Sequence, residues 1–361
     1  MSKSKKTKEK NGKKVQSDMT VSRKQSHVEL VIRENVEHQT THTGFDALRF
    51  VHNALPEISY SQIDASTQFL GKHLNYPLLI SSMTGGYAKA LEINQELAVI
   101  AAEFHLAMGV GSARQAMETD EHHETYRVVR REYPEGLLFT NVGASEVVQL
   151  GAQRKIKKLS RIIELIQADA LIVHLNPLQE LMQPEGNTDF RGVLFGIELC
   201  VKELRLPIIV KEVGAGISGD VAKRLLEVGV RAIDVAGAGG TSWAGVEILR
   251  HKKKDRAALE PFWDWGIPTV DALVEVAKLK EKITFGLIAS GGITDGIDAA
   301  KCIALHADLV GIARPLLQAL FAGGEKALRQ KTETIITQFK QAMFLTGSSD
   351  LGALAKQPLH K

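Results

Sequence analysis

The sequence has little of what would place it outside a reducing, aqueous compartment. Its 361 residues include only two cysteines, Cys200 and Cys302, which form no metal-ligand spacing, so we expect buried free thiols. No apolar run approaches the roughly 20 residues that span a bilayer. The N-terminus has neither the apolar stretch of a signal peptide nor the arginine-rich pattern of a transit peptide. These absences predict a cytoplasmic protein with no membrane partner.

Outside one short N-terminal segment, positive and negative residues nearly balance. The formal net charge is +3, but residues 1–14 hold seven lysines and one glutamate, so the rest of the chain carries −3. The basic character therefore belongs to a tail, and no nucleic-acid-binding face is expected. Residues 1–20 have few apolar positions and no periodicity, which predicts a disordered lysine-rich tail in front of one domain over residues 21–361.

What the chain does contain is a series of eight short apolar runs rich in Val, Ile and Leu. Continuous apolarity is typical of parallel strands buried on both faces, and the intervals are long enough for helices. Helical spacing is found at Val28–Asn35, and the candidate outer helices are Leu91–Phe104, Arg154–Gln167, Gly192–Leu204, Gly219–Val228, Thr269–Leu279, Gly296–Leu305, Leu316–Ala322 and Glu325–Leu345. The sequence therefore predicts an α/β fold, a single (β/α)₈ TIM barrel with an N-terminal extension and its active site at the carboxyl ends of the strands. The runs are Leu78–Ser81, Ala107–Val110, Leu137–Asn141, Ala170–Asn176, Pro207–Lys211, Ala232–Val235, Phe285–Ser290 and Leu309–Ile312.

One connection, between Thr241 and Val270, is unusually long. It contains a basic run, His251–Lys254, and an aromatic cluster, Phe262–Trp265. Loops of this length are usually lids, subunit contacts or disordered segments. A solvated charge run explains the lysines, but tryptophans are costly to expose, so the cluster favours a subunit contact.

Two glycine-rich signals follow the last two runs. Barrels often bind a phosphate through backbone N–H groups of these loops, and glycine lets the backbone approach the oxygens. Arg314 would add a charge-assisted contact. A tight turn remains the alternative for Ser290–Gly292 alone, but the second signal about 20 residues later favours a phosphate site. The signals are Ser290-Gly291-Gly292-Ile293 and Gly311-Ile312-Ala313-Arg314.

Lys211 favours a flavin over a sugar phosphate. It ends an apolar run, where a fixed cation suits the N1/O2 edge of a reduced flavin. The alternative is a structural lysine paired with Glu212 or another carboxylate. Further backbone and polar groups suited to a flat ring and its phosphate lie at Met83–Gly86, Ser112, Asn141 and Gly239–Thr241.

The remaining polar residues are mostly cationic or amide and suit a polyanion. Glu180 could hold a Mg²⁺ that neutralises phosphate oxygens. Alternatively, Arg23 and Lys24 simply end the basic tail and Glu180 is a surface acid. No pair of buried acids is expected near the barrel mouth. The candidate anion ligands are Arg23, Lys24, His27, Arg114, His174 and Asn176.

From about residue 22 to 346 the sequence resembles the type 2, FMN-dependent isopentenyl-diphosphate Δ-isomerases. The string His-Leu-Asn-Pro-Leu-Gln-Glu at 174–180 is the most specific match. The other matching stretches include Arg23-Lys24-x-x-His27, Ser82-Met83-Thr84-Gly85-Gly86, Thr140-Asn141-Val142-Gly143, Gln183-Pro184-Glu185-Gly186, Val210-Lys211-Glu212-Val213-Gly214 and Asp264-Trp265-Gly266-Ile267-Pro268-Thr269.

The resemblance implies interconversion of isopentenyl and dimethylallyl diphosphate in isoprenoid biosynthesis, with reduced FMN as acid and base. It also implies NAD(P)H as reductant, Mg²⁺ on Glu180, Gln179 as a catalytic residue and a homo-tetramer or octamer. Substrate would contact Arg23, Lys24, His27, Arg114, His174, Asn176 and Gln179. FMN would contact Ser82, Met83, Thr84, Ser112, Asn141, Lys211, Thr241, Gly291, Gly292, Ile293, Ala313 and Arg314.

Three positions depart from the family pattern: Ala236, Thr294 and Asn187. The first two bear on phosphate affinity and the third on a loop contact. Two rival functions stay open. An FMN-dependent 2-hydroxy-acid oxidase would need a His and a nearby Arg after the loop at Gly239–Trp243, and no such pair follows. A non-catalytic flavin- or phosphate-binding barrel is the other.

Overall fold

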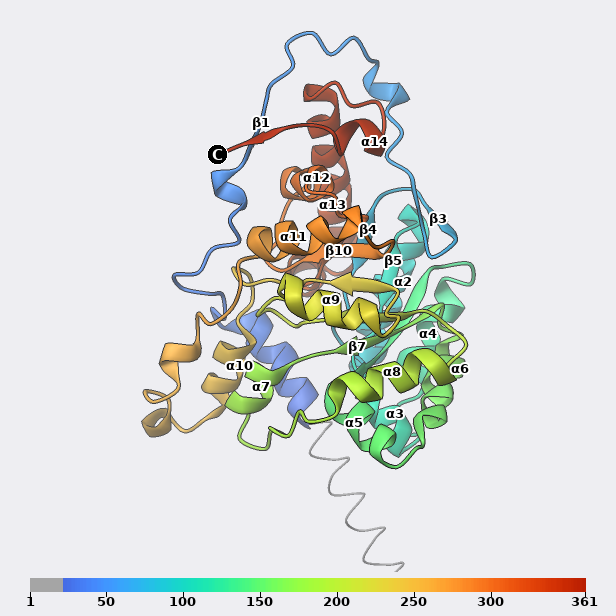
Figure 1. The fold of residues 1–361 in the computed structure, drawn as a ribbon, viewed down its shortest axis with the longest axis vertical. Coiled ribbons are helices and arrows are strands. Elements are labelled where there is room, and N and C mark those ends of the chain that lie inside the picture. Colours follow the sequence, from blue (N-terminus) through green and yellow to red (C-terminus); the bar gives the residue numbers. More distant parts are fainter. Residues whose placement is uncertain (1–21) are drawn as a thin grey trace, which may run out of the picture.

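The computed structural model of the protein describes residues 22–361, and eight parallel strands close into a barrel at its centre (Figure 1). Each strand pairs with its sequence neighbour, and β11 closes the ring against β4. All eight predicted strands and the TIM-barrel fold are confirmed. The strands are β4 (Leu78–Ile80), β5 (Ala107–Gly109), β6 (Leu138–Gly143), β7 (Ala170–His174), β8 (Ile208–Lys211), β9 (Ala232–Asp234), β10 (Gly286–Ser290) and β11 (Leu309–Ile312).

Apolar side chains fill the barrel interior and leave its carboxyl end to polar groups. Phe139, Ile172 and Ile209 belong to one buried cluster inside the ring. A hairpin formed by β2 (Thr67–Phe69) and β3 (Lys72–Leu74) contributes Phe69 and Leu74 to the same cluster. Because the interior is packed, a ligand can enter only where the strands end and the loops begin.

The predicted outer helices are present, but one of them is divided, two of them are joined, and the structure adds helices where none was predicted. The helix expected at Arg154–Gln167 is divided into η3 (Ile156–Leu159) and α6 (Ser160–Ile166). The two expected C-terminal helices form α13 (Arg314–Leu345), whose backbone is non-helical at Gly323 and Gly324. Short helices α3, α4 and α5 follow the second and third barrel strands where none was predicted. The helices are α2 (Ala90–Phe104), α3 (Arg114–Glu118), α4 (Glu124–Glu132), α5 (Ala144–Ala152), α8 (Val193–Glu203), α9 (Gly219–Glu227), α11 (Thr269–Ala277), α12 (Gly296–Ala304) and α14 (Leu351–Leu354).

The long connection after β9 is not the open loop that its length suggested. It folds into α10 (Trp243–Arg250) and the short turns η4 (Lys253–Asp255) and η5 (Glu260–Phe262), and α10 packs on α7 (Pro177–Met182). Trp263 is buried in this unit, where its ring fills the space above Gly245. Trp265 is 63% exposed. The segment therefore builds one wall of the barrel mouth.

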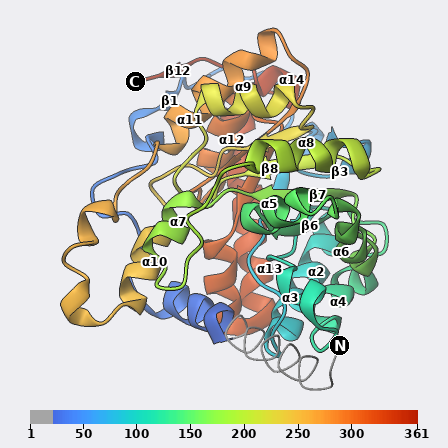
Figure 2. The ribbon, with the colours of Figure 1, turned by 60° about the horizontal axis from the view of Figure 1, so that its bottom comes forward.

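A helix over residues 22–33, here called the N-terminal helix, lies beside α10 and the start of α13 at the carboxyl end of the barrel (Figure 2). It begins before the predicted Val28–Asn35. Val31 and Val36 pack against Val246 of α10, and the Ser242 N–H donates to the Val36 carbonyl at 2.7 Å. The tail predicted for residues 1–20 lies outside the described residues.

Two expectations from the composition can be compared with residues 22–361. Cys200 and Cys302 are buried free thiols, as predicted. Within this range no helix is both long enough and apolar enough to cross a membrane.

Candidate active site

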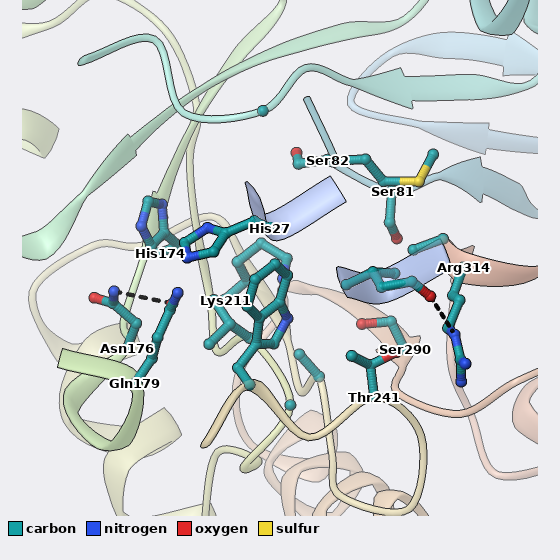
Figure 3. Close-up of a pocket in the computed structure, with 18 of the residues that line it drawn as sticks. His27, Ser81, Ser82, His174, Asn176, Gln179, Lys211, Thr241, Ser290 and Arg314 are labelled. Carbon is teal, nitrogen blue, oxygen red and sulfur yellow. Dashed lines mark hydrogen bonds between the residues drawn. The ribbon is translucent and has the colours of Figure 1, made fainter. Parts of the chain in front are cut away.

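A cavity of about 300 Å³ opens at the carboxyl ends of the strands, and every predicted site residue lines it (Figure 3). The N-terminal helix, the strand-end loops, α7 and the start of α13 all contribute side chains. The lining includes Arg23, Lys24, His27, Ser82, Met83, Thr84, Ser112, Arg114, Asn141, His174, Asn176, Gln179, Glu180, Lys211, Thr241, Gly291, Gly292, Ile293, Ala313 and Arg314.

Strand register brings three chemically active side chains into one row. His174 of β7 pairs with Lys211 of β8, which pairs with Asp234 of β9. Residues in register on parallel neighbours point to the same face, so the row faces the cavity end of the barrel. The Ser290 hydroxyl, at the end of β10, donates to Asp234 Oδ1 at 2.6 Å and so connects the next strand of the barrel to this row.

Lys211 is a buried, paired cation. Its Nζ lies 3.9 Å from Asp234 Oδ2 and donates to the Glu212 carbonyl at 2.5 Å. Burial raises the pKa of Asp234, and the nearby Lys211 charge opposes that rise. Burial also raises the pKa of Glu212. The N–H groups of residues 213–215 donate hydrogen bonds to its carboxylate and oppose that rise. Lys211 therefore both pairs with a buried carboxylate and lines the cavity, so the two interpretations of this lysine are compatible.

His174 is held neutral. Burial first, and then the positive charges of Lys211, Lys24 and Arg23, lower the pKa of its imidazole to about 3. Its Nδ1 lies 2.7 Å from Asn141 Oδ1, which can only accept, so Nδ1 carries the proton. The unprotonated Nε2 is left as an acceptor, so this side chain is not a cationic phosphate ligand at neutral pH.

The loops after β9 and β10 form a cradle of bare backbone. Gly291 and Gly292 have φ values of +108° and +68°, and a Cβ on Gly291 would lie 2.2 Å from the Gly237 carbonyl oxygen. A Cβ on Gly240 would lie 2.4 Å from the Gly292 nitrogen. Ala313, beside them, is the N-cap of α13, and helix N-termini attract anions. Such a set of backbone N–H groups suits an anion such as a phosphate.

Arg314 lines the same cavity, and its guanidinium is tied to the N-terminal helix and to Glu37. Its Nε donates to the Val31 carbonyl at 3.2 Å, and its Nη1 lies 2.6 Å from Glu37 Oε1. Ala236 lines the cavity with a positive φ of +40°. Thr294 lines the same wall.

Across the cavity, the loop after β4 presents small polar groups. The hydroxyls of Ser81, Ser82 and Thr84 are buried and have no hydrogen-bond partner among residues 22–361. Buried hydroxyls without a protein partner are unusual, and these three can bond to water or to a polar ligand. The neighbouring β5 loop approaches so closely that a Cβ on Gly111 would lie 2.7 Å from Thr84 backbone atoms.

At the opposite end, α7 projects a set of amides and one carboxylate. Asn176 Nδ2 donates to Gln179 Oε1 at 3.3 Å and to Glu180 Oε1 at 3.1 Å. Gln179 Nε2 donates to Glu247 Oε1 at 2.9 Å. These contacts fix which end of the Gln179 amide faces each neighbour.

Glu247 of α10 was not predicted, and the expectation that no pair of buried acids lies near the mouth is wrong, since Glu212, Asp234 and Glu247 are all buried there. The Glu247 side chain is fully buried, with His27 Nε2 2.8 Å and Arg250 Nη1 2.5 Å from its oxygens. Burial alone would raise its pKa, but His27, Gln179 and Arg250 together lower the pKa to about 2. Sequence reasoning missed Glu247 because it interpreted this segment as a loop and overlooked its helical spacing. Trp243, one turn before Glu247, packs edge-on against His27.

The cations near the mouth have different surroundings. Arg114 Nη1 lies 3.0 Å from Oε1 of Glu146, a largely buried acid whose pKa is raised by the loss of solvent contact. Arg23 lines the cavity and makes no hydrogen bond to another described residue. Lys24 is turned toward the protein: Nζ donates to the carbonyls of Gly85 and Ser112 at 2.7 and 2.6 Å.

Within residues 22–361, no three His, Cys, Asp or Glu side chains come together in a metal-binding cluster. Glu180 lines the cavity, and its Oε2 accepts the Asn187 N–H at 2.7 Å. Since that contact uses the Asn187 backbone, an asparagine there preserves it. A divalent ion would have one carboxylate from Glu180 and would need oxygen ligands from elsewhere.

Comparison with known proteins places this site in a class. A family model described as FMN-dependent dehydrogenase matches residues 20–129 and 188–361. Two solved mandelate oxidase structures, one with an FMN adduct and one with benzaldehyde, share the fold, with TM-scores of 0.65 and 0.66 at 17% and 16% identity. They cover 92% of this chain and 94% and 93% of their own. The protein is thus a barrel of the FMN-dependent dehydrogenase class.

Curated relatives define the family within that class. The isopentenyl-diphosphate delta-isomerase of Chlorobaculum parvum is 46% identical over 354 residues, covering 95% of this chain and 98% of its own. That of a Nostoc species is 48% identical over 339 residues, covering 94% and 95%. The chain belongs to the isopentenyl-diphosphate delta-isomerase family of isomerase enzymes, as the motifs predicted.

Proposed function

We propose that this protein interconverts isopentenyl and dimethylallyl diphosphate, the activity named for its relatives. The observation that supports this most strongly is the division of one cavity into two polar sides. The glycine-lined cradle, next to Ser290 and Thr241, forms one side, Asn176 and Gln179 form the other, and Lys211 lies between them (Figure 3). Arg23 also lines the cavity. A bound cofactor and an anionic substrate can therefore share the same cavity.

The residues fit FMN. Gly291, Gly292 and Ala313 would hold its phosphate, Lys211 would face the edge that gains negative charge, and the partnerless hydroxyls of Ser82 and Thr84 would meet polar ring atoms. The other predicted contacts are Met83, Ser112, Asn141, Thr241, Ile293 and Arg314. When bound and reduced by NAD(P)H, FMN would supply acid/base chemistry to the double bond.

The chain's own residues would bind and orient the substrate. Arg23 and Arg114 would hold diphosphate oxygens, and Glu180 would contribute a carboxylate to a Mg²⁺ that the diphosphate also binds. Neutral His174 would accept or relay a hydrogen bond through Nε2 rather than supply charge. Glu247, ionised at neutral pH, is no proton donor. It instead orients Gln179, whose free amide hydrogen would face the carbon skeleton.

The test is anaerobic turnover of isopentenyl diphosphate by the purified protein with FMN, Mg²⁺ and NADPH. We expect dimethylallyl diphosphate without stoichiometric loss of NADPH, and no product when the reductant is left out. Bound, reducible FMN without product would contradict the isomerase proposal. Oxidation of a 2-hydroxy acid in a parallel assay would then assign the oxidase alternative, and no turnover at all would assign a binding protein.

We further propose a cytoplasmic homo-oligomer, a tetramer or octamer, with residues 21–361 as one domain. Two buried free thiols support a reducing compartment. Trp265 and Leu181 are 63% and 56% exposed on the α7–α10 side, which supports a subunit contact there. Light scattering on the full-length protein measures the mass, and a monomer of 39.5 kDa would contradict the assembly.

A further inference from the structure

We propose that the Tyr126 hydroxyl is a positioning group for the proposed reaction, because it fixes Lys24 and so seats the N-terminal helix over the cavity. The inference rests on the proposed function only for its effect on substrate. The contact between helix and barrel can be tested without any turnover.

Lys24 connects the N-terminal helix to three separate segments. Its Nζ donates to the carbonyls of Gly85, after β4, and Ser112, after β5, and to the Tyr126 hydroxyl of α4 at 3.1 Å. An ammonium group has three N–H donors, so these three acceptors account for all of them. The head group therefore holds the helix to the barrel beside Arg23 and His27, the other predicted substrate contacts on this helix.

Tyr126 is the only one of these acceptors that is a side chain, and it is completely buried. Its hydroxyl donates to the Ser112 carbonyl at 2.9 Å while accepting from Lys24, so it joins a loop and the helix at a single atom. The ring fills the space left by two glycines. A Cβ on Gly85 would lie 2.3 Å from Tyr126 Cε1, and one on Gly86 2.7 Å from its hydroxyl oxygen.

The support under Tyr126 is rigid. The Thr125 hydroxyl, next to it on α4, accepts the Gly86 N–H at 2.9 Å, and Asn94 of α2 donates to the Thr125 carbonyl at 2.6 Å. Helices α2 and α4 also pack tightly on each other. A hydroxyl on such a support can set the position of a more loosely held helix.

The energetic reason lies in the burial of the Lys24 charge. Burial, reinforced by the adjacent Arg23 charge, lowers the pKa of Lys24 to about 7. A partly buried cation relies on the protein acceptors that replace water, and a hydrogen bond to a charged group is worth about tenfold or more in an equilibrium. Without the hydroxyl the ring still fills its space, but the helix loses part of its attachment.

The perturbation is Tyr126→Phe, and the matched control is Tyr133→Phe. Tyr133 is also buried, at the C-terminal end of α4, its hydroxyl makes no hydrogen bond to any of residues 22–361, and it does not line the cavity. With FMN loaded, we expect amide hydrogen exchange over residues 22–33 to rise about tenfold in Tyr126→Phe only. The KM for isopentenyl diphosphate should rise about tenfold, with kcat and the FMN Kd within twofold of wild type.

A second variant separates positioning from packing. Adding Tyr126→Phe to Lys24→Met should leave exchange of the N-terminal helix unchanged, since the hydroxyl acts through Lys24. Additive effects would overturn the proposal. So would unchanged exchange in Tyr126→Phe, or faster exchange throughout all helices with a lowered Tm. If the wild type does not isomerise the substrate, the proposed function fails, while the exchange comparison still decides whether Tyr126 seats the helix.

Discussion

Replacing Glu247 by glutamine tests how strongly the buried carboxylate holds the mouth together. Contacts with His27, Gln179 and Arg250 lower the pKa of Glu247 from 4.5 to about 2 against the effect of burial. At about 1.4 kcal/mol per pKa unit, the native state prefers the ionised side chain by about 3 kcal/mol. Glutamine resembles the protonated form, so Glu247→Gln should lower the free energy of unfolding by about 3 kcal/mol at pH 7.

The same shift fixes the direction of the pH dependence. A carboxyl whose pKa is depressed by folding stabilises the protein above its unfolded pKa, and that stability is lost as the pH falls through the folded value. Wild type and Glu247→Gln should therefore differ most above pH 5 and converge as the pH falls from 4.5 toward 2. Glu146, Glu212 and Asp234, whose pKa values burial raises, are present in both proteins and cancel in the difference.

Equilibrium urea unfolding at pH 7, 5 and 3.5 measures this difference. The matched control is Glu103→Gln, which breaks a half-exposed ion pair with Arg329 at 2.9 Å and should change the free energy of unfolding by less than about 1 kcal/mol. A loss below about 1 kcal/mol in Glu247→Gln at pH 7, or a loss that stays constant down to pH 3.5, would refute the reasoning.

Three further predictions concern residues that line the cavity at the ends of the barrel strands. Lys211→Met should weaken FMN binding at least tenfold in a fluorescence titration. It should also lower the Tm, because the Asp234 carboxylate is left buried without its cation. Adding Asp234→Asn should restore the Tm but not the affinity. Gly291→Ala, with φ at +108° and backbone 2.2 Å from the new Cβ, should cost about 1–3 kcal/mol in urea unfolding and abolish FMN binding, and full binding would contradict the cradle. His174, with its pKa lowered to about 3, should add no inflection to the pH profile of kcat/KM between pH 5.5 and 8; a group titrating near pH 6.5 that disappears in His174→Gln would show the imidazole to be charged.

Much of the site could be predicted because barrel topology converts sequence order into position. Each apolar run ends at the same side of the ring, so residues such as Lys211 and Gly291 had to meet once the runs were recognised as strands. The family motif at His174–Glu180 then added the amide-rich wall. None of this required knowledge of side-chain packing.

Glu247 and the wall that carries it could not be predicted in the same way. The basic run at His251–Lys254 and the aromatic cluster beyond it concealed α10, whose apolar face is buried only because α7 and Trp263 cover it. Nor could the sequence indicate that the Lys24 ammonium turns toward backbone carbonyls. Those acceptors come from loops 61 and 88 residues away along the chain.

The barrel, the order of its strands, the glycine-rich loops and the family could be predicted without a structure, because continuous apolar runs, backbone-permissive residues and motifs are local properties of the chain. The charge states of the site residues and their partners depend on the tertiary fold. Burial and neighbours from other strands make His174 neutral, keep Glu247 ionised and pair Lys211 with Asp234. These properties depend on which groups are brought together away from water, and that is settled only when the ring closes and the N-terminal helix lies across its mouth.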